Sequence, residues 1–135
     1  MKYTDIETAA AEPCASSMIL TFRAIGYNLE TAVADVIDNS ISADAKNIWF
    51  NSEWKGGNSV ISILDDGCGM NNDELIQAMK PGAKNPNDER DEKDLGRFGL
   101  GLKTASFSQC KNLIVVSKKE DFDTVYWIWD LNYVN

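Results

Sequence analysis

A carboxylate and a carboxamide lie four residues apart in the segment Asp35-Val36-Ile37-Asp38-Asn39-Ser40. In a helix, this spacing places Asp35 and Asn39 on one face, one turn apart. A neutral Asn oxygen suits Mg²⁺, which keeps several waters and binds substrate phosphates. The carboxylate can orient or deprotonate an attacking water. The alternative interpretation is the solvated face of an amphipathic helix.

A second group, Asp65-Asp66-Gly67-Cys68-Gly69-Met70, directly follows an apolar run. Two glycines two residues apart let the backbone turn sharply and approach a ligand closely. A carboxylate at the end of a hydrophobic strand is at risk of desolvation and needs a donor. The amino group of adenine is such a donor, and Met70 offers soft contact to a flat ring. The alternative is an Asp-Gly turn that ends a strand.

The third group is Gly96-Arg97-Phe98-Gly99-Leu100-Gly101-Leu102-Lys103-Thr104. Closely spaced glycines before a helix expose backbone N–H groups that can hold phosphate. Lys103 and Thr104 add a cation and a hydroxyl. The segment is not a P-loop, because Leu102 separates Gly101 from Lys103, and its G-x-x-G-x-G order is not the dinucleotide motif. The alternative is a loop followed by the start of a helix.

The elements that carry these groups follow from periodicity and capping signals. Ser16–Ile25 is predicted to be a helix that ends at Gly26. Asn28 is predicted to cap a second helix, in which Val33, Val36, Ile37 and Ile41 form an apolar stripe. The later predicted elements are strands at Asn47–Phe50 and Val60–Leu64, a helix at Asn72–Met79, a polar loop at Pro81–Leu95, a helix at Arg97–Gln109, and strands at Leu113–Ser117 and Thr124–Leu131.

The strand Val60–Leu64 is rich in apolar residues and is predicted to be buried on both faces. The order of elements is helix, helix, hairpin, helix, loop, helix, hairpin. It predicts an α+β fold, a two-layer sandwich in which helices cover one face of a mostly antiparallel mixed sheet.

Composition excludes several classes of function. The chain has 135 residues, which suits one domain, and no histidine, which excludes Ser-His-Asp and Cys-His catalysis and a phosphoacceptor histidine within it. Its 13 basic and 21 acidic residues give a net charge of −8, which argues against a broad grip on nucleic acid. The 3 cysteines are widely spaced and suit a reducing cytosol. Neither a signal peptide nor a membrane span is indicated, so a cytoplasmic location is expected.

Taken together and in order, the three groups resemble the GHKL ATPases, which include the gyrase B subunit, the ninety-kilodalton heat-shock chaperones, histidine kinases, MutL mismatch-repair proteins and the microrchidia proteins. The matching segments are "ADVIDNSISADA", "DDGCGM" and "GRFGLGLKTASFS". "GLKTASFSQC" is most similar to microrchidia-like and bacterial members. The resemblance covers roughly Glu30 to Ser108. It implies the Bergerat fold and an ATP-binding domain over residues 1–135.

The resemblance also implies a role for each matching residue. Asn39 would be the Mg²⁺ ligand that bridges the metal to the phosphates of ATP, and Asp65 the adenine-binding carboxylate. Gly67 and Gly69 would let the chain pass close to the base, on which Met70 would pack. Ala43 would be the small residue beside the nucleotide. The ATP lid would span about 81–99, and the residues contacting ATP at its end would be Gly96, Arg97, Phe98, Gly99, Leu100, Gly101, Leu102, Lys103 and Thr104.

One departure concerns hydrolysis. Hydrolysing relatives usually carry Glu four residues before the Mg²⁺-binding Asn, and this chain has Asp35 there. Asp is one methylene shorter, and a displacement of about 1 Å can cost roughly 10²-fold in rate. The favoured expectation is that Asp35 positions water for ATP hydrolysis that drives a conformational switch. The alternative is a nucleotide-binding sensor without useful hydrolysis. A kinase branch and an adapter with a decayed pocket are less favoured.

The other departure is the end of the chain at Asn135, one hairpin after the third group. Relatives have further strands there, and usually a second domain. The chain is therefore expected to be the N-terminal part of a longer protein, which could form a homodimer and could have DNA or another protein as partner.

Overall fold

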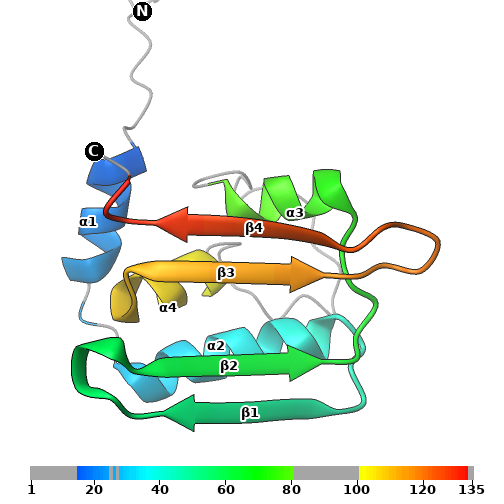
Figure 1. Cartoon of the computed structure of the whole chain (residues 1–135), viewed down its shortest axis with the longest axis horizontal. Helices are drawn as coiled ribbons and strands as arrows, with labels where there is room; N and C mark the ends of the chain where they lie inside the picture. Colours follow the sequence, from blue (N-terminus) through cyan, green and yellow to red (C-terminus); the bar gives the residue numbers. More distant parts are fainter. Residues whose placement is uncertain (1–14, 25, 27, 81–100, 134–135) are drawn as a thin grey trace, which may run out of the picture.

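The computed structural model describes residues 15–24, 26, 28–80 and 101–133 (Figure 1). Among them the order of elements is the predicted one. The structure gives the bounds as α1 (Ala15–Ala24), α2 (Leu29–Ser42), β1 (Ile48–Glu53), a 3₁₀ turn η1 (Gly56–Asn58), β2 (Val60–Asp65), α3 (Asn72–Met79), α4 (Gly101–Gln109), β3 (Asn112–Ser117) and β4 (Val125–Asp130). The predicted loop Pro81–Leu95 lies outside the described residues.

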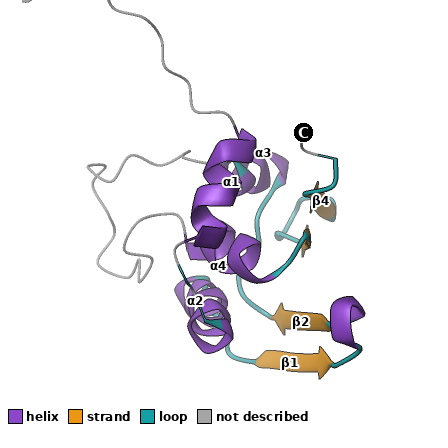
Figure 2. Ribbon diagram, turned by 90° about the vertical axis from the view of Figure 1, so that its left-hand side faces the viewer, coloured by secondary structure: helices purple, strands orange, loops and turns teal. Residues whose placement is uncertain are grey.

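The strands form one layer and the helices lie on one side of it (Figures 1 and 2). This arrangement confirms the predicted two-layer α+β class. β1 pairs with β2 in antiparallel fashion, from Ile48 opposite Asp65 to Glu53 opposite Val60. β3 pairs with β4 in the same way, from Asn112 opposite Asp130 to Ser117 opposite Val125.

The strand layer consists of two hydrogen-bonded hairpins, β1–β2 and β3–β4. In Figure 1, β2 and β3 occupy neighbouring positions and run in the same direction. Within the described residues the two are not joined by a hydrogen-bonded ladder. The predicted mixed layer is therefore present as two antiparallel pairs. β2 and β3, which run in the same direction, end at the same edge of the layer (Figure 1).

Local capping explains where two of the helices begin. The side chain of Asn28 accepts a hydrogen bond of 2.8 Å from the backbone N–H of Thr31, which satisfies a free amide of the first turn of α2. At α3, Asn71 and Glu74 form a capping box in which each side chain accepts from the other's backbone N–H. Both helices therefore start where the sequence provides a side-chain oxygen.

The core lies between α3, α4 and β4. Leu75, Met79 and Phe107 are the largest fully buried side chains of the described residues. The ring of Phe107 meets that of Trp129 edge to face, with centroids 5.7 Å apart. The indole N–H of Trp129 donates to the carbonyl oxygen of Met79 over 3.1 Å. One aromatic side chain of β4 thus contacts α4 and the end of α3 together.

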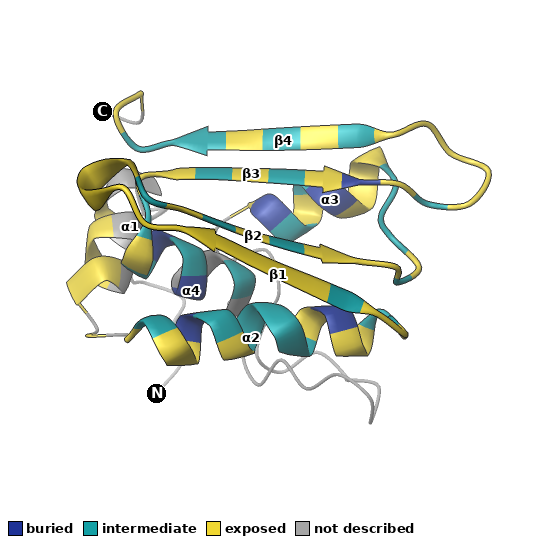
Figure 3. Cartoon of the chain, turned by 60° about the horizontal axis from the view of Figure 1, so that its bottom comes forward, coloured by how far each residue is buried: buried dark blue, intermediate teal, exposed yellow. Residues whose placement is uncertain are grey.

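The prediction that β2 is buried on both faces is wrong. Val60 and Leu64 are 57% and 64% exposed, whereas Ile61 and Ile63, which alternate with them, are half-buried. The reason is that helices cover only one face of the layer, so one face of an antiparallel pair remains in solvent. Figure 3 shows this alternation along the strands.

No helix among the described residues is both long and apolar enough to cross a lipid bilayer.

Candidate functional site

α2, the helix that carries Asp35 and Asn39, packs against the two elements that adjoin the other two groups of residues. α2 lies against α4, which begins within the third group, and against β2, which ends at the second group. Figure 3 shows α2 and α4 adjacent on one side of the strands. The fold therefore places the first two sequence groups, and the described part of the third, on elements that pack against one another or directly after them.

Asp65 is the last residue of β2, and its carboxylate faces α2. One oxygen, Oδ2, accepts a hydrogen bond of 2.7 Å from the hydroxyl of Ser40. The other, Oδ1, accepts one of 2.9 Å from the backbone N–H of Gly67. A carboxylate offers about four lone-pair sites, so these two bonds fix its orientation and leave capacity for a ligand donor.

Ser40 contacts the candidate residue Asp65, and the sequence analysis did not single it out. It is 4% exposed and follows Asn39 directly on α2. A signal for it exists, because Ser40 lies three residues after Ile37 and four after Val36, on the apolar side of the helix. A hydroxyl in that position needs a polar partner, and Asp65 provides it.

Gly67 lies against the C-terminal end of α2. A Cβ atom at Gly67 would come within 2.7 Å of the Ala43 Cβ and 2.9 Å of its carbonyl oxygen. That carbonyl also accepts a hydrogen bond of 2.9 Å from the backbone N–H of Cys68. Ala43 follows the last residue of α2 as its C-cap. The glycine and the small alanine therefore allow the turn to contact the helix closely.

Gly69 has a protein neighbour on the opposite side of the turn. Its φ of +67° lies in the left-handed region that favours glycine. A Cβ atom there would overlap the backbone carbonyl of Lys118, just after β3. The next residue, Met70, donates its backbone N–H to the Ser117 hydroxyl over 2.7 Å. The turn Gly67–Met70 thus lies between α2 and the end of β3.

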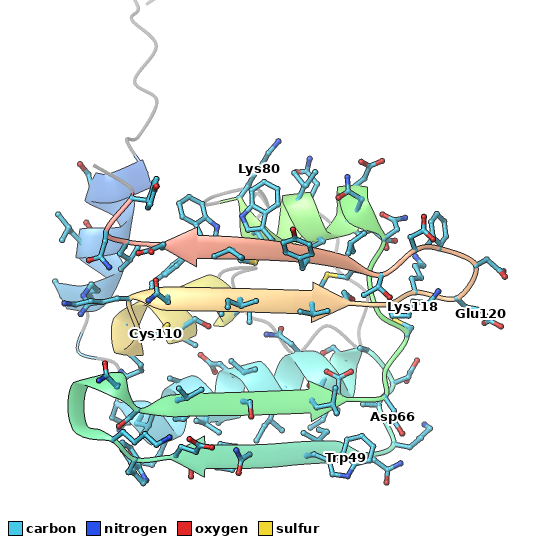
Figure 4. The ribbon with its side chains drawn as sticks, viewed as in Figure 1. Trp49, Asp66, Lys80, Cys110, Lys118 and Glu120 are labelled. Carbon is cyan, nitrogen blue, oxygen red and sulfur yellow. The ribbon has the colours of Figure 1, made fainter. Side chains whose placement is uncertain are left out.

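Asp66, the neighbouring carboxylate, has a different set of contacts. Its Oδ1 accepts from the backbone N–H groups of Lys46 and Asn47 over 2.7 and 2.8 Å, and its Oδ2 accepts from the Asn47 side chain over 2.7 Å. The Asn47 and Lys46 hydrogen bonds hold the pKa of the Asp66 carboxyl below its usual value. Figure 4 shows Asp66 and Lys118 at the same edge of the strand layer. Asp66 therefore holds the backbone just before β1 in place, whereas Asp65 contacts α2.

On α2, Asp35 and Asn39 occupy positions one turn apart, as predicted. Asp35 is half-buried and Asn39 is exposed. Within the part of the chain that is described, no three Asp, Glu, Cys or His side chains gather as a metal cluster. The donor set that is present, one carboxamide beside an expected phosphate position, fits Mg²⁺ held by few protein ligands and by phosphate and water.

The third group is described only in part. Gly101 to Thr104 form the first turn of α4. Gly96, Arg97, Phe98, Gly99 and Leu100 lie outside the described residues, as does the rest of the predicted lid. α4 is described from Gly101 onwards, which leaves the earlier residues of the predicted helix Arg97–Gln109 outside as well.

Comparison with known proteins points to one family. A family model described as histidine kinase-, DNA gyrase B- and HSP90-like ATPase matches residues 27–135. Human "ATPase MORC2" is 31% identical over 121 residues, and "ATPase morc-1" of Caenorhabditis elegans 29% over 98 residues. The "DNA mismatch repair protein MutL" of Clostridium perfringens is 33% identical over 95 residues.

These matches cover most of this chain and little of each relative. They span 81% of the chain for MORC2, 73% for morc-1 and 69% for the MutL protein. They span 11%, 11% and 14% of the relatives' own lengths, in the same order. The similarity thus concerns one domain of larger proteins.

Proposed function

The chain belongs to the histidine kinase-, DNA gyrase B- and HSP90-like ATPases, a family of ATP-binding domains, and we propose that it binds Mg-ATP and hydrolyses it to drive a conformational switch in a longer protein. The observation that carries the proposal is the 2.7 Å hydrogen bond from Ser40 to Asp65. It joins the helix of the proposed phosphate side to the carboxylate of the proposed adenine side.

The adenine side is built on Asp65. Its oxygens have one protein donor each, and a further lone pair can accept from the adenine amino group. The close contact of Gly67 with Ala43 holds the turn Gly67–Met70 against the C-terminal end of α2. Gly69 and Met70 continue the same turn. We assign Ala43, Asp65, Gly67, Gly69 and Met70 to this side of the nucleotide.

The phosphate side is built on α2 and the start of α4. Asn39 is exposed on α2 and is the proposed Mg²⁺ ligand, and the bound metal would neutralise phosphate charge. The first turn of α4, Gly101 to Thr104, has backbone N–H groups without helical partners, which favour an anion. We assign to the same phosphate side the preceding residues of the third group, Gly96, Arg97, Phe98, Gly99 and Leu100.

Asp35 is the proposed catalytic residue. It lies one turn before Asn39 on α2, the helix that faces Asp65. There it would orient a water for in-line attack on the γ-phosphorus and accept the water's proton as the bond to the bridging oxygen of ADP breaks. Positioning and electrostatics supply most of the catalysis in phosphoryl transfer, so the side-chain length of this residue matters.

A second candidate function is a nucleotide sensor that binds ATP without useful hydrolysis. Asp35 favours it, because its side chain is one methylene shorter than the Glu usual at this position, and about 1 Å of misplacement can cost roughly 10²-fold in rate. It requires saturable ATP binding with no phosphate release.

Phosphate release from Mg-ATP by the chain tests the catalytic assignment. We expect Asp35→Asn to retain ATP affinity and to lose turnover by about 10²-fold or more, because a positioned base contributes about 10²–10⁴-fold. Glu30→Gln is the matched control, since Glu30 lies in the first turn of the same helix. Unchanged turnover in Asp35→Asn would refute the role of Asp35. ATP binding without release by the wild type would select the sensor.

Partners of the longer protein remain proposals. One relative is named as a DNA mismatch repair protein. We therefore propose DNA, a second protein or a second copy of the intact molecule as candidate partners. The net charge of −8 gives this chain no basic face for DNA. The free thiols of Cys68 and Cys110 suit the cytoplasmic location that we propose.

A further inference from the structure

β3 has a polar residue where its pattern calls for an apolar one. Leu113 and Val115 face the helices and are half-buried, while Ile114 and Val116 between them are exposed. Ser117 is the next residue on the inward face and is 9% exposed. A buried hydroxyl loses free energy unless it is hydrogen-bonded, so its partner indicates why a serine stands there.

The partner is the turn after β2. The Ser117 oxygen accepts the backbone N–H of Met70 at 2.7 Å, a contact between residues 47 positions apart. The neighbouring contact is also close, since the Gly69 Cα lies against the Lys118 carbonyl with no room for a Cβ. Met70 precedes Asn71, the N-cap of α3. Its N–H lies before the helix and has no helical acceptor.

The other end of this turn is held by α2. Cys68 donates to the Ala43 carbonyl over 2.9 Å, and Gly67 donates to Asp65 over 2.9 Å. The turn that follows Asp65 is therefore fixed on one side by α2 and on the other by β3. Removal of either attachment frees the backbone beside the proposed adenine position.

We propose that Ser117 is a positioning residue that sets ATP affinity by anchoring the turn Gly67–Met70 to the end of β3. The inference rests on the proposed function, because it names what supports the adenine side of that site. Ser117 acts through the Met70 N–H and is separated from Asp65 by the turn. Its loss weakens nucleotide binding while the residues proposed for hydrolysis on α2 are unchanged.

The test compares three variants by calorimetric titration with Mg-ATP and by amide hydrogen exchange of Met70 in the free chain. Ser117→Ala removes the hydroxyl, Ser117→Thr retains it, and Val115→Ala truncates the inward residue two positions earlier on the same strand. We expect Ser117→Ala to weaken ATP binding about 2- to 12-fold, the range for one lost neutral hydrogen bond. Exchange at Met70 should become faster relative to amides within α3.

Ser117→Thr should restore both the affinity and the slow exchange. Val115→Ala should lower the melting temperature and leave the affinity of the folded chain unchanged. Wild-type affinity in Ser117→Ala, or an equal loss in Val115→Ala, would overturn the positioning role alone. A folded wild type that binds no ATP would overturn the proposed function and this inference with it, and the two failures are thus distinguishable.

Discussion

Two adjacent carboxylates, Asp65 and Asp66, have different partners and therefore different roles. Asp65 receives a hydroxyl from α2 and one backbone N–H from its own turn. Asp66 receives three donors from Lys46 and Asn47, at the entry to β1. The first arrangement leaves Asp65 with capacity for the ligand donor that we propose, while the second attaches Asp66 to the start of β1.

The Asp66 hydrogen bonds predict an acid-dependent loss of stability. They lower the folded-state pKa of Asp66 below the usual value of an aspartate, so the unfolded chain takes up the proton first as the pH falls. The contribution of Asp66 is therefore complete above about pH 4 and is lost as the pH drops through the folded-state pKa. Urea midpoints of the wild type and Asp66→Asn, measured from pH 6 to pH 3, should converge at the acidic end.

Glu74 contributes in the same direction, because its ion pair with Lys119 and the Asn71 N–H lower its pKa. The matched variant Glu74→Gln retains the Asp66 contacts, so its midpoint should still fall with acid. Midpoints of the wild type and Asp66→Asn that remain a constant distance apart from pH 6 to pH 3 would contradict the assignment.

At this scale the sequence predicted where some residues of the proposed site lie in the fold and missed others. Asp65, Gly67 and Gly69 stand in a recognisable order, so their position at the end of β2 was predicted. Ser117 was not, because a serine at the end of a strand has no spacing signature. Ser40 was overlooked, although its spacing from Val36 and Ile37 places it on the apolar side of its helix. Each acquires its role from a partner distant in sequence, Asp65 for Ser40 and Met70 for Ser117.

Among the elements, local signals predicted the helices well. Asn28 and the Asn71–Glu74 pair cap α2 and α3 through contacts three residues apart, so their information is local. The burial of β2 was predicted wrongly, because the apolar content of Val60–Leu64 indicated two covered faces. Which face of a strand is covered depends on helices far away in the chain, and that is not encoded in the strand itself.

We expect the same Gly-to-Ala change to lower stability far more in the turn between β2 and α3 than in the turn between β1 and β2. Gly69→Ala adds a Cβ at φ +67° that overlaps the Lys118 carbonyl. Left-handed strain and overpacking together should cost about 2 kcal/mol or more. Gly57→Ala, in the η1 turn, meets no atom within 4 Å and should change stability by about 0.5 kcal/mol or less.

The free energy of unfolding in urea, measured for both variants, checks this comparison. A Gly69→Ala chain as stable as Gly57→Ala would show that the turn is not packed against β3. It would also remove the structural basis for the positioning role of Ser117.

For the whole molecule, the element order was sufficient to predict the class of fold. Helices and hairpins alternate in an order that packs well only as helices over one face of a strand layer, and Figure 2 shows that arrangement. The two hairpins were predicted, but the absence of a hydrogen-bonded ladder between β2 and β3 among the described residues was not. The sequence marks strands that pair within a hairpin through short turns, and it carries no comparable signal for strands that are distant in the chain. The uncovered face retains large exposed apolar side chains, among them Trp49, Leu64, Ile114, Val116, Tyr126 and Ile128.

The central claim is that this chain has an ATP site built on Asp65, and calorimetric titration of the chain with ATP and Mg²⁺ at neutral pH tests it most directly. Asp66→Asn is the matched control, because it makes the same chemical change at the next residue. We predict saturable binding by the wild type and by Asp66→Asn, and at least about tenfold weaker binding by Asp65→Asn, as for a lost hydrogen bond to a charged group. No binding by the folded wild type, or equal binding by Asp65→Asn, would contradict the account.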